Sequence, residues 1–248
     1  MSLSPHLKSV IAFLILACMA LAAAQPLSAE PVSSTGQKSN SSAPGDLSTN
    51  AFIKAGCSAG MSGLDCSRTG IDRRFNCSMI FNASEGLDNL SPKIPMAECL
   101  TYDNGYDNSQ SQVHGIIRVG CMVPAYKKYI VLVDGEFRSI STADEFKSYF
   151  APVETPLEAL SFAVALTDSV PRYDTSPPDG YFQVASTIEP TSVKKVEGGF
   201  EVRLFNMEVC GCGTHPYYAV DYLVTTSGDV TELSRQKVYD SSMMICMD

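Results

Sequence analysis

The set of cysteines limits most strongly how this chain can fold. Nine cysteines occur in 248 residues, and eight of them follow residue 50. Five of the eight lie between residues 57 and 121, and three lie near the C-terminus. Because both numbers are odd, complete pairing requires at least one disulfide between the two regions. The eight disulfide candidates are Cys57, Cys66, Cys77, Cys99, Cys121, Cys210, Cys212 and Cys246.

Counting leaves the individual pairs open, since eight cysteines allow many connectivities. We expect Cys99 to pair with Cys121, and one of Cys210 and Cys212 to pair with Cys246. One residue separates Cys210 from Cys212, and the ring that would join them is strained. We therefore expect these two cysteines to have different partners.

The ninth cysteine, Cys18, lies in a segment typical of a secretory signal peptide. Lys8 precedes an apolar run from Val10 to Leu21, and small residues end the segment at Ala24. The run is too short to cross a membrane comfortably. We predict cleavage after Ala24 and a mature protein that is periplasmic, on the cell surface or secreted.

The sequence ILAC (15–18) offers a second processing route, because it resembles a bacterial lipobox. Cys18 would then carry a lipid anchor. This alternative is the less favoured one, because Leu16 stands two residues before the cysteine and fits the pattern poorly. Either route removes Cys18 from the disulfide count.

Composition divides the chain into four segments. Residues 1–24 are the predicted signal peptide. Residues 25–50 are rich in Ser, Pro, Gly and Asn without apolar periodicity, which indicates a disordered linker. Residues 51–152 hold five cysteines among many turn formers, and we expect an irregular, disulfide-stapled part with some β-structure. We predict that residues 153–248 form an α+β part.

Two capping boxes predict helices in the middle of the chain. Thr142 is followed three residues later by Glu145, and Thr155 by Glu158. A threonine N-cap and a glutamate at the third helical position satisfy each other's backbone groups. The second helix should run to about Thr167.

The second helix is predicted to cover an antiparallel sheet. Leu157, Leu160, Phe162 and Val164 give it an apolar stripe. The apolar period then changes to two, which is typical of strands, so we predict an α+β fold with a helix packed on an antiparallel meander in two layers. The expected strands cover residues 181–188, 193–196, 200–205, 218–224 and 230–239.

Further β-structure is predicted upstream. The run GIIRVGCMV (115–123) is an expected strand, and KYIVLV and EFRSI are two more, joined by Asp134-Gly135. An Asp-Gly pair between apolar runs favours a type I′ hairpin turn. Gly198-Gly199 is expected to form a second hairpin turn.

Three motifs in residues 155–239 carry a family resemblance. They are TPLEALSFAVALT as the helix, GGFEVRLF as a central strand and YYAVDYLVTTSGDVTEL as a strand–turn–strand unit. Together they resemble PepSY-type and peptidase-propeptide modules of exported bacterial proteins. The resemblance implies a cystatin-like fold that binds or restrains peptidases. The insertion with Cys210 and Cys212 and the Cys-rich N-terminal half depart from that pattern, and the whole chain looks like an exported bacterial protein.

Charge and missing motifs argue against several functions. The net charge is −9 and no Lys/Arg cluster occurs, which argues against nucleic-acid binding. The sequence has no P-loop, dinucleotide fingerprint or HExxH motif, and no nucleophile motif accompanies its histidines. We therefore expect no cofactor and no enzymatic activity, and no transmembrane span in the mature chain.

The segment CGCGTH (210–215) is the strongest candidate for chemistry. Thiolates of Cys210 and Cys212 and the imidazole of His215 suit Cu(I) or Zn(II), and methionines in the tail add thioether ligands. In an oxidising compartment both cysteines would instead form disulfides, and His215 would be a polar loop residue.

Three functional hypotheses follow. The first is an exported, disulfide-stabilised, non-enzymatic binding protein, such as an inhibitor or immunity-type factor, whose partner is an extracytoplasmic protein. The alternative is a copper- or zinc-binding or thiol-redox protein that uses Cys210, Cys212 and His215. An enzyme whose site the sequence does not display is the third.

Overall fold

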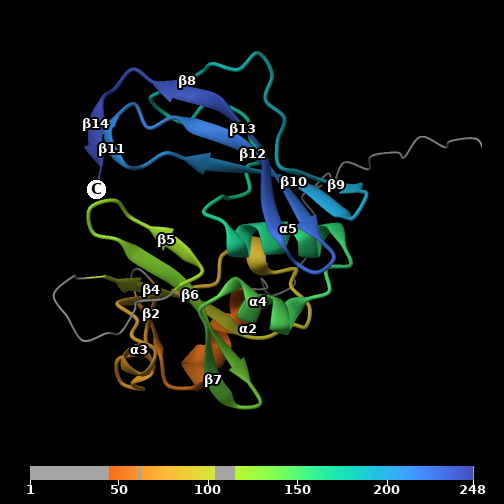
Figure 1. The fold of residues 1–248 in the computed structure, drawn as a ribbon. Coiled ribbons are helices and arrows are strands. Elements are labelled where there is room, and N and C mark those ends of the chain that lie inside the picture. The colour runs from red at the N-terminus through yellow and green to blue at the C-terminus, as the bar shows by residue number, and fades with distance from the viewer. Residues whose placement is uncertain (1–44, 61–62, 104–114, 248) are drawn as a thin grey trace, which may run out of the picture. The chain divides into compact units, whose positions relative to one another are not determined.

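The structure, a computed structural model, describes residues 45–60, 63–103 and 115–247 (Figure 1). The predicted signal peptide, the cleavage site, Cys18 and most of the predicted linker lie outside the described residues. Antiparallel sheets dominate the described part, and helices are few. No helix within it is both long enough and apolar enough to cross a bilayer.

The first large sheet is built from residues 79–140, in the order β3-β4-β6-β5, with β7 also paired to β6. Asp134 and Gly135 both have positive φ, 53° and 79°, and Val133 pairs with Glu136 across them. This backbone confirms the predicted type I′ turn. The strands are β3 (Met79–Asn82), β4 (Met96–Tyr102), β5 (Ile117–Val119), β6 (Ala125–Val133) and β7 (Glu136–Ile140).

Strand β4 is the element of this sheet that the sequence did not reveal. Met96 packs in one core cluster, whereas Ala97 and Cys99 pack in another on the opposite face. A strand buried on both faces lacks the alternation of apolar and polar residues that marks a half-buried strand. Strand β4 lies inside residues 51–152, which were expected to be irregular because of their many turn formers.

Short elements at the N-terminal side cover the outer face of this sheet. Phe52 of α2 is fully buried in a cluster that includes Ile80 of β3 and Ile130 of β6. Helix α2 begins inside the segment predicted as linker, so residues 45–50 are helical. These elements are α2 (Gly45–Lys54), β1 (Ser58–Gly60), β2 (Gly63–Asp65) and α3 (Ile71–Arg74). The 3-10 helix η1 (Glu85–Leu87) instead packs against α5, in the cluster that holds Met96.

The second large sheet has the order β8-β13-β12-β10-β9. Strands β9, β10, β12 and β13 follow one another in the sheet in the same order as in the sequence, as the predicted meander requires. The short strand β11, which lies between β10 and β12 in sequence, belongs to another sheet. Strand β8 departs from the meander, because it precedes the others in the chain and pairs with the far edge of β13. The strands are β8 (Tyr181–Gln183), β9 (Ser192–Val196), β10 (Gly199–Met207), β12 (Tyr217–Thr225) and β13 (Val230–Ser241).

The turn between β9 and β10 lies one residue earlier than predicted. Val196 pairs with Gly199, so Glu197 and Gly198 form the turn and Gly199 belongs to β10. A Cβ at Gly199 would lie 2.1 Å from the carbonyl oxygen of Val224 on β12. The second glycine therefore permits close approach of two strands, a role that the sequence pattern does not distinguish from a turn.

Both predicted capping boxes are present. They open α4 (Ala143–Phe150) and α5 (Pro156–Leu166). The backbone N–H of Glu145 donates to Thr142 Oγ1 at 3.1 Å, and that of Glu158 donates to Thr155 Oγ1 at 3.2 Å. Each glutamate side chain accepts from its N-cap backbone in return, which fixes where each helix starts.

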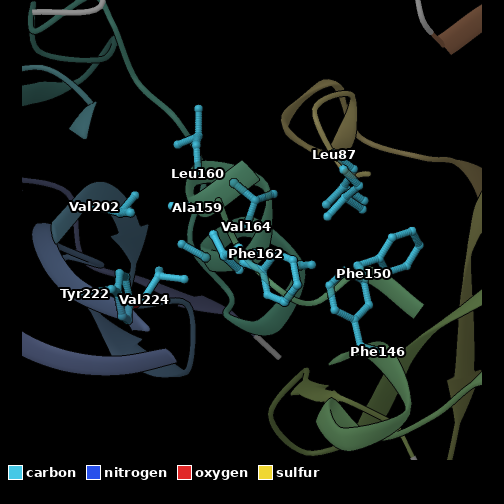
Figure 2. Packing of buried hydrophobic residues seen from close by; sticks show 14 of the residues in the cluster. Leu87, Phe146, Phe150, Ala159, Leu160, Phe162, Val164, Val202, Tyr222 and Val224 are labelled. Carbon is cyan, nitrogen blue, oxygen red and sulfur yellow. The ribbon is translucent and has the colours of Figure 1, made fainter. Parts of the chain in front are cut away.

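Helix α5 is buried from Ala159 to Ala165 on every side rather than along one stripe. Strands β9, β10, β12 and β13 pack against it, and η1 packs against it as well. Figure 2 shows Val202, Tyr222 and Val224 on one side of the helix and Leu87, Phe146 and Phe150 on the other. Leu157, predicted in the stripe, is 42% exposed, because the first turn extends beyond the packed region.

Two hydrogen bonds attach α5 to the first half of the chain. The Tyr129 hydroxyl on β6 donates to the carbonyl oxygen of Ala165 at 2.9 Å, and Ser161 Oγ donates to that of Gly86 at 2.7 Å. A single core cluster holds residues from both sides of the predicted boundary at residue 153. The predicted mixture of helices and antiparallel sheets is therefore confirmed, and the sheets make up most of the structure.

Replacing Phe162 should test how far stability depends on α5. The Phe162 ring is fully buried, lies edge-on to Phe146 with centroids 5.2 Å apart, and packs under Gly228. Phe162→Ala should lower the free energy of unfolding by about 3–5 kcal/mol in a denaturant titration. The control Leu157→Ala, on the same helix, should cost less than about 1 kcal/mol. Similar losses in both variants would contradict this packing.

Candidate functional site

Four disulfides connect the eight predicted cysteines. The bridge between Cys121 and Cys210 joins the N-terminal and C-terminal groups, which confirms the inference from odd numbers. Cys212 pairs with Cys246, so the expectation that one of the two neighbouring cysteines does so is confirmed. The remaining bridges are Cys57–Cys66 and Cys77–Cys99.

The predicted pair Cys99–Cys121 is wrong. Cys99 lies on β4 and bonds to Cys77, which lies two residues before the start of the neighbouring strand β3. The two Cα atoms are 5.4 Å apart. Pairing of β3 with β4 decides this bridge, and the sequence had not revealed β4.

Two disulfides and two small strands gather at one place, which we call the disulfide end. It comprises the loop 120–124 between β5 and β6, residues 208–215, and residues 243–247. Strand β11 (Gly211–Gly213) pairs there with β14 (Ile245–Met247), and Cys212 stands directly opposite Cys246 (Figure 1). The bridge from Cys121 to Cys210 attaches the loop to the chain just before β11.

His215 is a structural part of the disulfide end. It is only 2% exposed, and its φ of 49° turns the chain between β11 and β12. Nδ1 lies 3.0 Å from the carbonyl oxygen of Glu208, and Nε2 lies 2.9 Å from that of Ile245. Carbonyl oxygens only accept, so a ring N–H of His215 is the donor in these contacts. His215 lies in the loop between β11 and β12, as the disulfide alternative expected, and it is buried because its imidazole bridges two segments.

Charged and hydroxyl groups lie around the segment that carries His215. Tyr181 donates from its hydroxyl to the carbonyl oxygen of His215 at 3.3 Å. On β13, the Lys237 ammonium lies 2.8 Å from the Asp240 carboxylate. Hydrogen bonds from Lys237 and from Thr214 hold the pKa of Asp240 below its usual value, because they stabilise the ionised carboxylate. These contacts anchor β13 to the segment that carries His215.

The predicted metal ligands are near one another in sequence but are engaged elsewhere. Cys210 and Cys212 are in disulfides with different partners, and both ring nitrogens of His215 face carbonyl oxygens. Among residues 45–60, 63–103 and 115–247, no three His, Cys, Asp or Glu side chains form a group suited to a metal ion. A metal site at these three residues stays a prediction, and it would require a reduced chain.

Exposed apolar side chains are concentrated at the disulfide end. Met122 is 78% exposed and Met244 is 77% exposed, and Val123, Met243 and Ile245 are exposed as well. Methionine side chains are flexible and polarizable, so they adapt to the shape of a partner. A group of exposed apolar residues on a folded protein is typical of an interaction surface.

A hollow of about 290 Å³ lies beside the exposed loop. Val123 belongs both to this hollow and to the exposed group, so the two features are continuous. The volume is close to the lower limit for small-molecule pockets, and most of the lining is apolar. The lining residues are Leu100, Tyr102, Val119, Gly120, Val123 and Ala125.

The apolar pattern of the sequence did not predict the exposed loop. It placed Met122 and Val123 inside a strand covering 115–123, whereas β5 ends at Val119. Gly120 and Pro124 flank the pair and are the signals that could have indicated a loop. The exposed state of Met122 depends on the tertiary structure, because methionine is among the residue types most often buried.

Comparison with protein-family models, with curated proteins and with solved structures finds no match for this chain. The resemblance of residues 155–239 to PepSY-type modules therefore stays a prediction.

Removing individual disulfides should show which one restrains the chain most. Cys121 and Cys210 are 89 residues apart, whereas Cys57 and Cys66 are 9 apart. Replacing the first pair by serine should cost about 4–5 kcal/mol of unfolding free energy, and the second about 2–3 kcal/mol, because the longer loop loses more entropy when closed. Denaturant titration of both double variants gives the comparison. A larger loss for the shorter loop would contradict it.

Proposed function

We propose that this protein is an exported, disulfide-stabilised binding protein that holds an extracytoplasmic protein partner, as an inhibitor or immunity-type factor does. One observation carries the proposal: exposed apolar side chains gather where two disulfides join the ends of the fold. A rigid surface binds without first being ordered, so little affinity is lost when it meets a partner.

Two further features support the proposal. Four disulfides favour an oxidising compartment, since thiols stay reduced in most cytosols. The predicted resemblance of residues 155–239 to PepSY-type modules, which bind or restrain peptidases, agrees with the proposal and stays a prediction. The net charge of −9 does not favour nucleic acid as the partner.

Crosslinking in intact cells should test the proposal. A double variant, Met122→Glu with Met244→Glu, places two charges on the exposed surface. The control, Leu233→Glu, changes an exposed leucine on β13. We expect the unmodified protein and the control to be crosslinked to the same partner. The amount of partner crosslinked to the double variant should be lower by about tenfold or more, because a buried unpaired charge disfavours an apolar interface.

The readout is the amount of each crosslinked protein, measured by mass spectrometry. Failure of the unmodified chain to be crosslinked to any protein would contradict the proposal. Equal capture by the double variant would also contradict it, because the partner would then contact another surface.

The second candidate is thiol-redox or metal chemistry at Cys210, Cys212 and His215. The solvent exposure of three cysteines favours this second candidate. Because Cys210, Cys212 and Cys246 are exposed, a reductant can reach the disulfides that they form. Cys99, in contrast, is fully buried. Reduction of the exposed bridges would release thiolates suited to Cu(I) or Zn(II).

Counting thiols distinguishes the two candidates. Protein isolated without reductant should contain no free thiol if the disulfides are permanent staples, as the binding proposal requires. Two or more free thiols per chain would favour the second candidate. Alkylation under mild reductant, followed by mass spectrometry, should label Cys212 and Cys246 before Cys77 and Cys99, because buried bridges are less accessible.

A further inference from the structure

We propose that the loop from Gly120 to Pro124 occupies the substrate cleft of an endopeptidase, with the Met122 side chain in the pocket that accepts long apolar residues. This inference rests on the proposed binding function and specifies its partner. The surface involved is the disulfide end, and the remainder of that surface lies beside the loop.

The loop presents one side chain more than any other. Val119 pairs with Ala125, so five residues connect β5 to β6. Among the large apolar side chains of the described residues, Met122 has the greatest exposed fraction. An unbranched, uncharged side chain of this length fits a deep and narrow apolar pocket, the kind that sets the specificity of many endopeptidases.

The loop is held in place despite this exposure. The bridge from Cys121 to Cys210 ties it to the C-terminal segment, and the backbone N–H of Asp103 donates to the carbonyl oxygen of Pro124 at 2.8 Å. Gly120 has φ of 77°, and a Cβ there would lie 2.7 Å from the carbonyl oxygen of Val123. The loop is therefore folded tightly and is preorganised for binding.

The same restraints favour an inhibitor over a substrate. Hydrolysis of the bond between Met122 and Val123 would consume one water and leave a carboxylate on Met122 and an ammonium group on Val123. Neither new end would leave, because the disulfide retains Cys121 and the paired strand β6 begins at Ala125. Ends that stay together keep the enzyme occupied and allow the bond to re-form.

The apolar hollow next to the loop gives the partner a second contact. Val119 and Ala125 line it at the base of the loop, and Val123 lines it from the loop itself. An apolar side chain on the rim of the enzyme cleft would bury itself there when Met122 enters the cleft. A projection and a hollow on neighbouring residues fix one orientation of the two proteins.

Inhibition assays with the oxidised full chain test this inference. One enzyme is a chymotrypsin-type endopeptidase, which cleaves after long apolar residues, and the other is a trypsin-type endopeptidase, which cleaves after Lys or Arg. The chain should inhibit the first on a small peptide substrate and leave the second unaffected. Met122→Lys should weaken inhibition of the first enzyme by about 100-fold and create inhibition of the second, because the pocket contact decides specificity.

The matched control is Leu233→Lys, which adds the same charge to an exposed side chain on β13, outside the disulfide end. It should leave inhibition of both enzymes unchanged. Thermal unfolding midpoints of both variants should equal that of the unmodified chain, since neither side chain is buried.

Three results would overturn the inference: no inhibition of the chymotrypsin-type enzyme, no effect of Met122→Lys on that inhibition, or an equal effect of Leu233→Lys. Crosslinked partner capture that persists alongside any of these results leaves the binding function standing and removes only the assignment to the loop. Loss of both capture and inhibition removes the binding function itself.

Discussion

The disulfide between Cys121 and Cys210 is the constraint on which the candidate surface depends. It closes a separation of 89 residues and joins a loop of the first sheet to the segment that follows β10 of the second. A covalent link over so long a stretch removes much of the entropy of the unfolded chain. It also determines which apolar side chains share one end of the molecule, because Met122 is adjacent to one half-cystine and β11 begins next to the other.

Helix α5 is the second element that unites the chain. Its middle residues are buried on all sides, and Tyr129 and Ser161 link it by hydrogen bonds to segments that precede it in sequence. A helix that is apolar around its whole circumference must be enclosed by other elements. The core therefore extends across the predicted boundary at residue 153, and the second half is more than a helix lying on its own sheet.

The segment 210–215 illustrates how compartment changes the chemistry of the same residues. Reduced, it offers two thiolates and an imidazole, which suit a soft metal ion. In the oxidised structure its sulfurs belong to two bridges, and His215 holds the carbonyl oxygens of Glu208 and Ile245 together. The residues that suggested a metal site thus stabilise the surface proposed for binding a protein.

Local signals in the sequence determined the starts of α4 and α5, the turn at Asp134 and the class of the second sheet, because capping, turn conformation and apolar period act within a few residues. The odd number of cysteines in each of the two groups was enough to require a disulfide between them. Which cysteines pair depended on strand neighbours far apart in sequence, and β4 was hidden because both of its faces are buried. The exposure of Met122 and of Leu157, and the burial of His215, were decided only by packing of distant segments, since no residue carries information about what will cover it.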